Sequence, residues 1–241
     1  IDAAWWRERL TSCRVRRDGI DATAWRAVHA EGDGLPALVV DRYDRWLVVQ
    51  LLSAGLETQR GLIVDALRDV FEPEGILFRH DVPTRRLEGL DDGVELAYGS
   101  VPEQVEVREG AIRWYAAPWT GQKTGAFLDQ RENRLAAGAL VPSGGTALDC
   151  FSYHGSFALH LAQRASHVTA LDVSGEALAR GAEHAALNGF SQIDFVTGDA
   201  FDVLPPWGKA GRRFDVVVVD PPAFAKSKAN VPAALRGYHE V

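Results

Sequence analysis

Hydrophobic and polar positions in the first hundred residues repeat with the periods of both helices and strands. Trp5, Trp6 and Leu10 share one side of an amphipathic helix predicted near the start of the chain. The predicted helices cover residues 1–17 and 56–70. Apolar runs predict strands over residues 37–41, 46–52 and 75–79, the first two joined by a polar turn. These elements predict a compact α/β domain.

The pattern changes in the second half of the chain. A hairpin is predicted over residues 104–118, with Gly110 supplying the positive φ of its turn. Beyond it, helices predicted over residues 130–139, 156–163 and 176–187 alternate with strands over 147–151, 168–171, 194–197 and 214–219. Such alternation predicts a parallel, doubly wound sheet. The expected fold class is therefore α/β, with a smaller α/β domain over residues 1–103 and a doubly wound domain over residues 104–241.

Composition narrows the protein class. The chain has 241 residues, a formal net charge of -7, 46% hydrophobic residues and no apolar run as long as the roughly 20 residues of a membrane helix. Its two cysteines, Cys13 and Cys150, have neither metal-ligand nor disulfide spacing, so no metal site is predicted and a reducing cytoplasm is favoured. Two basic groups are either nucleic-acid-facing patches or solvated faces: Arg7, Arg9, Arg14, Arg16 and Arg17, and Arg79, His80, Arg85 and Arg86.

The most informative candidate site follows the last predicted strand. Residues 214–219 are largely β-branched, which predicts a strand buried on both faces. The strand ends at Asp220, Pro221 and Pro222, where the prolines stop strand pairing and stiffen the backbone. Because open α/β sheets bind ligands at the carboxyl ends of their strands, Asp220 is a candidate for holding a nucleobase. The alternative is a turn that only ends the strand.

Three more acids lie at or near the carboxyl ends of predicted strands. Asp149, Asp172 and Asp199 could each be a capping or turn residue, but four acids on successive strand ends predict one shared crevice. Asp172 lies about 20 residues beyond the first tight turn, where such sheets hold a ribose diol. Asp199 would offer a carboxylate beside an apolar wall to an adenine. The turn at residues 149–157 lacks the glycine fingerprint of dinucleotide-binding proteins.

Several multi-residue segments resemble a known family. Residues 148–153, 171–174, 198–200 and 220–222 are similar to class I S-adenosylmethionine-dependent methyltransferases. Two longer segments, residues 31–43 and 121–131, narrow the resemblance to the large-subunit (23S) ribosomal RNA cytosine-5 methyltransferases. That family carries a PUA domain, a central α/β domain and a Rossmann-like catalytic domain. The resemblance implies that this chain, which begins at Ile1 and contains no methionine, is a fragment lacking the PUA domain and the C-terminal end.

The resemblance also implies a cofactor and a set of site residues. The cofactor is S-adenosylmethionine, and its implied binding residues are Gln122, Thr124, Phe127, Arg131, Asp149, Phe151, Ser152, Tyr153, Gly155, Asp172, Val173, Ser174, Asp199, Ala200 and Asp220. Of these, Gln122, Thr124, Phe127 and Arg131 would close over the cofactor, and residues 151–155 would hold its methionine part. The implied catalytic group is Asp220, Pro221 and Pro222, with Asp220 holding the N3/N4 edge of a cytosine.

Cytosine C5 needs activation before it accepts a methyl group. The family adds a cysteine thiolate to C6, and the resemblance places that cysteine beyond Val241. Cys150 is predicted to be an inert core residue at a strand end and Cys13 to lie far from the site. We therefore expect residues 1–241 alone to be inactive. His154 is either a satisfied loop histidine or a contact to the base.

The expected partner is ribosomal RNA of the large subunit, with no membrane association, and the strand-rich first domain makes a homodimer plausible. Guanine-N7 methylation on the same fold stays open, because that reaction needs no catalytic cysteine. A non-catalytic RNA-binding relative is a further alternative. A nicotinamide-dependent oxidoreductase is disfavoured by the missing glycine fingerprint.

Overall fold

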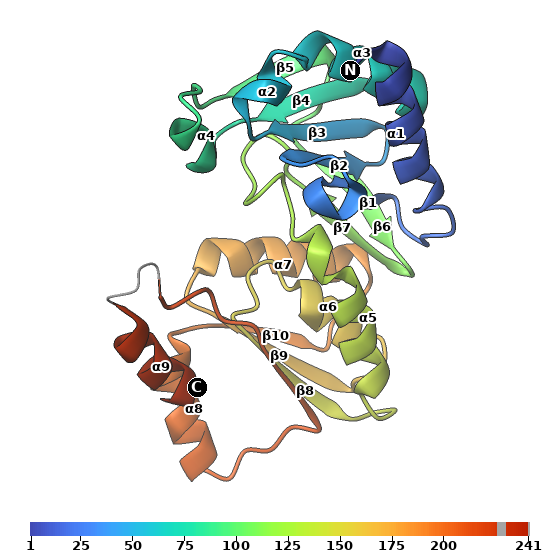
Figure 1. Cartoon of the computed structure of the whole chain (residues 1–241). Helices are drawn as coiled ribbons and strands as arrows, with labels where there is room; N and C mark the ends of the chain where they lie inside the picture. The colour runs from blue at the N-terminus through green and yellow to red at the C-terminus, as the bar shows by residue number, and fades with distance from the viewer. Residues whose placement is uncertain (226–229, 241) are drawn as a thin grey trace. The chain divides into compact units, whose positions relative to one another are not determined.

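The chain folds into two compact units, Ile1–Asp129 and Gln130–Val241 (Figure 1). The computed structural model describes residues 1–225 and 230–240, and Lys226, Ser227 and Lys228 of the segment after Asp220 lie outside the described residues. The predicted domain boundary at residues 103/104 differs from the observed division. The hairpin of β6 (Val105–Glu109) and β7 (Ile112–Ala116) belongs to the first unit, because the Thr23 amide donates to the Arg108 carbonyl at 2.8 Å and the Arg108 amide to the Thr23 hydroxyl at 2.8 Å.

The first unit is built on a five-stranded sheet in the order β1-β2-β3-β4-β5. The strands are β1 (Ala24–His29), β2 (Leu38–Tyr43), β3 (Trp46–Leu51), β4 (Gly75–Arg79) and β5 (Val94–Gly99). β3 and β4 are parallel and are connected through α3 (Arg60–Phe71), while the other pairs are antiparallel. The sequence predicted β2, β3 and β4. It did not predict β1 or β5, whose burial patterns do not alternate cleanly, with β5 mostly exposed.

Two helices and the sheet of the first unit share one hydrophobic core. α1 (Ala3–Val15) begins at Asp2, whose carboxylate accepts from the Trp5 amide at 2.9 Å. It buries Trp6, Leu10 and Cys13 in the core to which α3 also contributes. Trp5 is only partly buried, so the predicted apolar side of α1 is confirmed for two of its three residues. The helix predicted over residues 56–70 is two helices, α2 (Ala54–Glu57) and α3, and the short α4 (Thr84–Leu87) follows β4.

The second unit contains a parallel four-stranded sheet in the order β10-β9-β8-β11, as the alternating pattern predicted. Its strands are β8 (Thr146–Cys150), β9 (His167–Asp172), β10 (Ile193–Thr197) and β11 (Val216–Val219). Its helices are α5 (Arg131–Leu140), α6 (Ser156–Ala162), α7 (Gly175–Leu187), α8 (Ala200–Lys209) and α9 (Val231–Glu240). Figure 1 shows α8 and α9 on the opposite side of this sheet from α5 and α6. The chain moves outward from β8 to β9 and β10, then returns to pair β11 with β8, which creates a topological switch point between β8 and β11.

The last strand differs from its prediction. Residues 214–219 were expected to be buried on both faces, but β11 covers only Val216–Val219, and Val217 and Val219 are 50% and 44% exposed. β11 is the edge strand of the described sheet, where it pairs with β8, and one of its two faces is left largely uncovered. The alternation of half-buried and exposed valines reports one covered face.

Among the residues that the structure describes, no helix has the length and apolar character needed to cross a bilayer.

Candidate active site

The predicted acids of the second unit lie at the carboxyl edge of its parallel sheet. Asp149 is the fourth residue of β8, Asp172 ends β9, and Asp220 follows β11 directly. The negative charges of Asp172 and Asp220 both act on Asp149, so the ends of these three strands do converge. Asp199 precedes α8 after β10, on the outer side of the same edge.

The loop after β8 has a constrained backbone. Phe151, Tyr153 and Gly155 adopt positive φ values of 61°, 52° and 73°, a conformation that non-glycine residues rarely take and that is common at functional sites. The Ser152 amide donates to the Leu171 carbonyl at 3.1 Å, which fastens the loop to β9. The loop predicted to hold the methionine part of a cofactor is thus held in one shape by its neighbouring strand.

Asp149 holds this loop through a buried hydrogen bond. It is 1% exposed, and its Oδ2 accepts from the Ser152 hydroxyl at 2.6 Å and from the Ala158 amide at 3.0 Å. Burial raises the pKa of the Asp149 carboxyl to about 7, and the charges of Asp172 and Asp220 add to the increase. The structure therefore gives Asp149 the position of an internal anchor rather than an exposed ligand contact.

Asp172 links the two loops that follow β8 and β9. Its Oδ2 accepts from the Tyr153 amide at 2.9 Å and its Oδ1 from the Ser174 amide at 2.8 Å. Ser174 in turn caps α7 by accepting from the Ala177 amide at 3.2 Å. A carboxylate has about four acceptor positions, so Asp172 can still bind two hydroxyl groups. Val173 beside it is 72% exposed and offers apolar surface at the same place.

Asp199 caps a helix, which was the alternative to a ligand contact in the sequence analysis. Its Oδ1 accepts from the Phe201 amide at 2.9 Å at the start of α8, and Ala200 is buried behind it. The Asp199 residue itself is exposed, so the cap does not close it off from a ligand.

The segment after Asp220 joins an aromatic cluster. Phe224 lies 6.3 Å from Phe151, 5.8 Å from Phe201 and 4.5 Å from Tyr238 between ring centroids, and its amide donates to the Tyr238 hydroxyl at 3.2 Å. The exposed carboxylate of Asp220 accepts at Oδ2 from Gln130 Nε2 at 3.1 Å. Sequence reasoning did not single out Gln130 or Tyr238, although Gln130 stands inside the 121–131 segment that carried the resemblance.

The other predicted cofactor residues are close in sequence to the division between the units, which falls after Asp129. Thr124 is 1% exposed in the first unit, where its hydroxyl donates to Asp41 Oδ2 at 2.5 Å and lies 3.1 Å from the Tyr43 hydroxyl. Gln122 is exposed, and Phe127 lies 4.6 Å below the Lys123 ammonium. Arg131 begins α5 in the second unit and pairs with Glu132.

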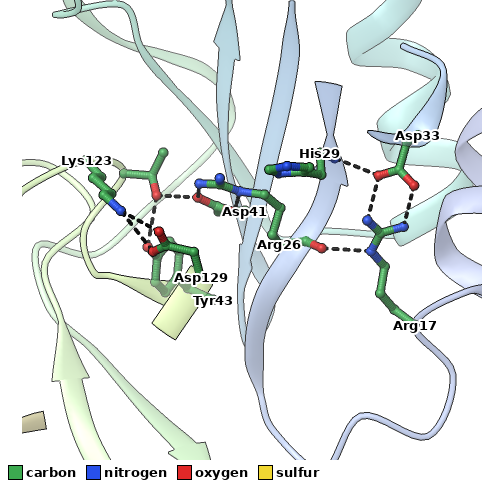
Figure 2. A network of polar contacts seen from close by, with 9 residues as sticks. Arg17, Arg26, His29, Asp33, Asp41, Tyr43, Lys123 and Asp129 are labelled. Carbon is green, nitrogen blue, oxygen red and sulfur yellow. Dashed lines mark hydrogen bonds and ion pairs between the residues drawn. The ribbon is translucent and has the colours of Figure 1, made fainter. Parts of the chain in front are cut away.

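Figure 2 shows the polar network around Asp41, which Thr124 joins through its hydroxyl group. Arg26 binds the fully buried Asp41 through two hydrogen bonds of 2.9 and 3.0 Å, and Asp41 accepts from Thr124. Lys123 donates to both carboxylate oxygens of Asp129 at 2.9 and 2.8 Å. Asp41 and Tyr43 come from the 31–43 segment and Thr124 from the 121–131 segment, so the two segments that carried the resemblance are joined by hydrogen bonds.

The glycines of the Gly-Gln-Lys-Thr-Gly turn are required by close backbone packing. A Cβ on Gly121 would lie 2.7 Å from the Gly125 carbonyl oxygen and 2.8 Å from that of Ala117. Gly125 has a φ of 132°, which side-chain-bearing residues rarely adopt. The buried guanidinium of Arg79 donates to the carbonyls of Pro118 and Gly121 at 2.7 and 3.0 Å and thereby fixes the same turn.

Much of the two predicted basic groups is occupied internally. Arg79 is paired with Asp81 at 2.8 Å and Arg85 with Glu57 at 3.0 Å, and both arginines are buried. In the first group, Arg7 pairs with Asp69 and Arg16 with Asp33. Arg17 also binds Asp33 (Figure 2). The side chains of Arg7 and Arg16 are about half exposed, as on a solvated face, whereas those of Arg17, Arg79 and Arg85 are largely buried in ion pairs.

Both cysteines are buried, which confirms the prediction that Cys150 is a core residue. Burial, with the charge of Asp149, raises the pKa of the Cys150 thiol to about 12, so Cys150 is not a thiolate near neutral pH. His154 stacks on Tyr153 at 3.7 Å between ring centroids, and burial lowers its pKa to about 4, which leaves a neutral loop histidine. Within the described residues no cluster of three His, Cys, Asp or Glu side chains is arranged to hold a metal.

The comparison with protein families decides the class. Residues 75–237 match the family model described as S-adenosylmethionine-dependent methyltransferase. The chain belongs to this family. Curated relatives support a finer resemblance: the chain is 41% identical over 250 residues to the ribosomal RNA large subunit methyltransferase I of Aeromonas hydrophila, covering 100% of this chain and 63% of that protein. The protein of the same name from Vibrio cholerae is 41% identical over 233 residues, covering 94% of this chain and 58% of that protein.

Solved structures confirm the α/β fold of the family member. A structure assigned as a SAM-dependent methyltransferase from Streptococcus mutans aligns with a TM-score of 0.80 and 23% identity, covering 99% of this chain and 64% of that chain. A methyltransferase solved in complex with SAH aligns with a TM-score of 0.80 and 24% identity, covering 95% and 60%. The methyltransferase family model and the absent glycine fingerprint leave no support for the oxidoreductase alternative. The chain spans about 63% of the length of the first curated relative.

Proposed function

We propose that the protein transfers the methyl group of S-adenosylmethionine to C5 of a cytosine in 23S ribosomal RNA. The observation that carries the proposal is the exposed carboxylate of Asp220, which sits on a proline-stiffened segment at the switch point beside the constrained loop after β8. The names of the relatives at about 40% identity support a large-subunit ribosomal RNA substrate.

The residues at the sheet edge fit the cofactor. Asp172 has free acceptor positions for the ribose hydroxyls, and the exposed side chain of Val173 offers apolar surface to an adenine. The loop of Phe151, Ser152 and Tyr153 would hold the methionine part with its fixed backbone, and Asp199 and Ala200 would border the adenine. When bound, the cofactor supplies an electrophilic methyl group on a sulfonium.

The remaining cofactor residues keep their predicted roles in this proposal. Gln122, Phe127 and Arg131 would contact the cofactor through their side chains. Thr124 would act through the shape of its segment, because its hydroxyl is already engaged by Asp41 and Tyr43.

Asp220, held by the stiff backbone of Pro221 and Pro222, would accept a hydrogen bond from the cytosine amino group and fix the ring. Methylation at C5 also needs a thiolate that adds to C6 and leaves after the C5 proton is removed. Buried Cys13 and Cys150 do not supply it, so the proposal needs a thiolate from another cysteine.

Isothermal titration of the protein with S-adenosylmethionine and, separately, with NAD tests the cofactor. We expect heat from the first and none from the second. Binding of NAD alone would sink the proposal.

Mass mapping of 23S ribosomal RNA from a strain lacking the gene tests the product. We expect one cytosine to lose a methyl group. Loss of a methyl group from a guanine N7 would establish the alternative reaction on this fold, and an unchanged 23S RNA would favour a non-catalytic RNA-binding role.

A further inference from the structure

A chain of three polar side chains ends at the carboxylate of Asp220. Asn133 Nδ2 donates to Gln130 Oε1 at 2.5 Å, and Gln130 Nε2 donates to Asp220 Oδ2 at 3.1 Å. All three residues belong to the second unit, with Gln130 at the N-cap and Asn133 in the first turn of α5.

The position of Gln130 is unusual for a purely structural residue. Helix N-caps favour short side chains whose oxygen accepts a backbone amide, yet Gln130 makes no capping hydrogen bond with its side chain. Its amide is turned to Asp220 across 90 residues of sequence instead. The start of α5 therefore fixes the backbone of Gln130, and its side chain contacts Asp220 at the end of β11.

The hydrogen-bond chemistry fixes the direction of this contact. Because Gln130 Oε1 accepts from Asn133, the Nε2 end of the same amide must face Asp220 and donate to it. This donor occupies Oδ2 and leaves Oδ1 of Asp220 as an acceptor for a ligand. Pro221 restricts the backbone conformation of Asp220, and the Gln130 donor restrains its carboxylate.

We infer that Gln130 is a positioning residue that orients the carboxylate of Asp220 toward the target base, and that Asn133 orients Gln130. The inference rests on the proposed role of Asp220 and adds two residues to it. It requires that the loss of Gln130 impair use of the RNA substrate without weakening the binding of S-adenosylmethionine.

The contact itself can be tested without any activity. In ¹H–¹⁵N spectra of the protein, the side-chain amide pair of Gln130 is identified by its absence in Gln130→Ala. We expect this pair to move in both Asp220→Ala and Asn133→Ala and to stay in place in Gln163→Ala. Gln163 is the matched control, a glutamine at the C-terminal end of α6, where its side chain contacts His160. A Gln130 pair that ignores Asp220→Ala would overturn the inference.

Methyl transfer to unmodified 23S RNA by the full-length protein tests the role, because we expect residues 1–241 alone to be inactive. We expect Gln130→Ala to lower kcat/KM by about tenfold, since a hydrogen bond to a charged group is lost, and Asn133→Ala to lower it by less. Calorimetry should give an affinity for S-adenosylmethionine within about twofold of the parent for both, and Gln163→Ala should match the parent in both assays.

A double-mutant cycle separates positioning from general damage. If Gln130 acts only through Asp220, then Gln130→Ala costs nothing further in an Asp220→Ala background. A tenfold loss that persists in that background, or a Gln130→Ala protein with parental kcat/KM while Asp220→Ala is impaired, would overturn the inference alone. Full activity of Asp220→Ala would instead reject the role proposed for Asp220, and this inference with it.

Discussion

At the scale of single residues, the four strand-end acids that look alike in the sequence have different roles in the structure. Asp149 is an internal anchor, Asp172 joins two loops, Asp199 caps a helix, and Asp220 is exposed. The sequence predicts where they converge because strand ends are readable from hydrophobic patterns. It does not predict which acid is buried, because burial depends on the path of the following loop and helix, here through the Ser152 hydroxyl and the Ala158 amide.

The raised pKa of Asp149 predicts a pH-dependent stability. Its folded-state pKa is about 7, above the ordinary 3.8, so the folded protein binds the extra proton and is stabilised below pH 4 relative to pH 7 and above. This contribution is lost as the pH rises from about 4 through about 7. We expect Asp149→Asn, which cannot ionise, to gain stability relative to the parent between pH 4.5 and pH 7.5. Urea unfolding followed by circular dichroism at the two pH values measures it.

The control for this prediction is Asp202→Asn, which changes an exposed acid in the first turn of α8. Its stability relative to the parent should be nearly the same at both pH values. An Asp149→Asn variant that follows the parent at both pH values would show that the buried carboxyl is ionised throughout.

At the scale of elements, helices and strands with a strong hydrophobic periodicity were predicted from the sequence. Elements whose residues depart from the usual propensities were missed. β4 was predicted with its observed bounds and α7 to within one residue, because both have clear apolar patterns and end signals. α8 was not predicted, because Pro205 and Pro206 argue against a helix, although Asp199 caps it and Trp207 packs on Phe214. The network of Thr124, Asp41 and Tyr43 was invisible to sequence patterns, since its members are 81 and 83 residues apart.

This network predicts a stability effect at Thr124. Thr124→Val has nearly the same shape but leaves the buried Asp41 and Tyr43 each without one hydrogen-bond partner, which costs roughly 1–3 kcal/mol. We expect the free energy of unfolding in urea to fall by about that amount. Thr58→Val, at an exposed threonine whose hydroxyl donates to the Gly55 carbonyl, should change it much less. Equal effects at the two positions would mean that the buried network contributes no special stability.

At the scale of the whole molecule, the chain is two compact units, and the segments that carried the resemblance fall in both of them. The 31–43 and 121–131 segments are joined within the first unit, whereas the strand-end acids belong to the second. The segments that resemble the family therefore belong to two separate structural features. In the first unit the feature is a buried hydrogen-bond network, and in the second it is the carboxyl edge of a parallel sheet.

The second feature leads to a prediction about ligand-linked stability. A cofactor that binds only the folded protein raises the free energy of unfolding by about 2.7 kcal/mol at 100 times its Kd. We expect S-adenosylmethionine to raise the melting temperature of the protein and Asp172→Ala to abolish most of that rise, because the variant loses both the ribose acceptor and the carboxylate that holds the Tyr153 and Ser174 amides. Differential scanning fluorimetry over a cofactor titration measures it.

The matched control is Asp194→Ala, an exposed acid near the amino end of β10, at the opposite edge of the same sheet. Because Asp194 lies away from the strand ends that converge on Asp149, its variant should keep the full cofactor-induced rise. Asp172→Ala also removes two loop contacts, so its melting temperature without cofactor is the baseline from which its rise is counted. A full rise in Asp172→Ala would place the ribose elsewhere and would remove the carboxyl edge of β9 from the cofactor site.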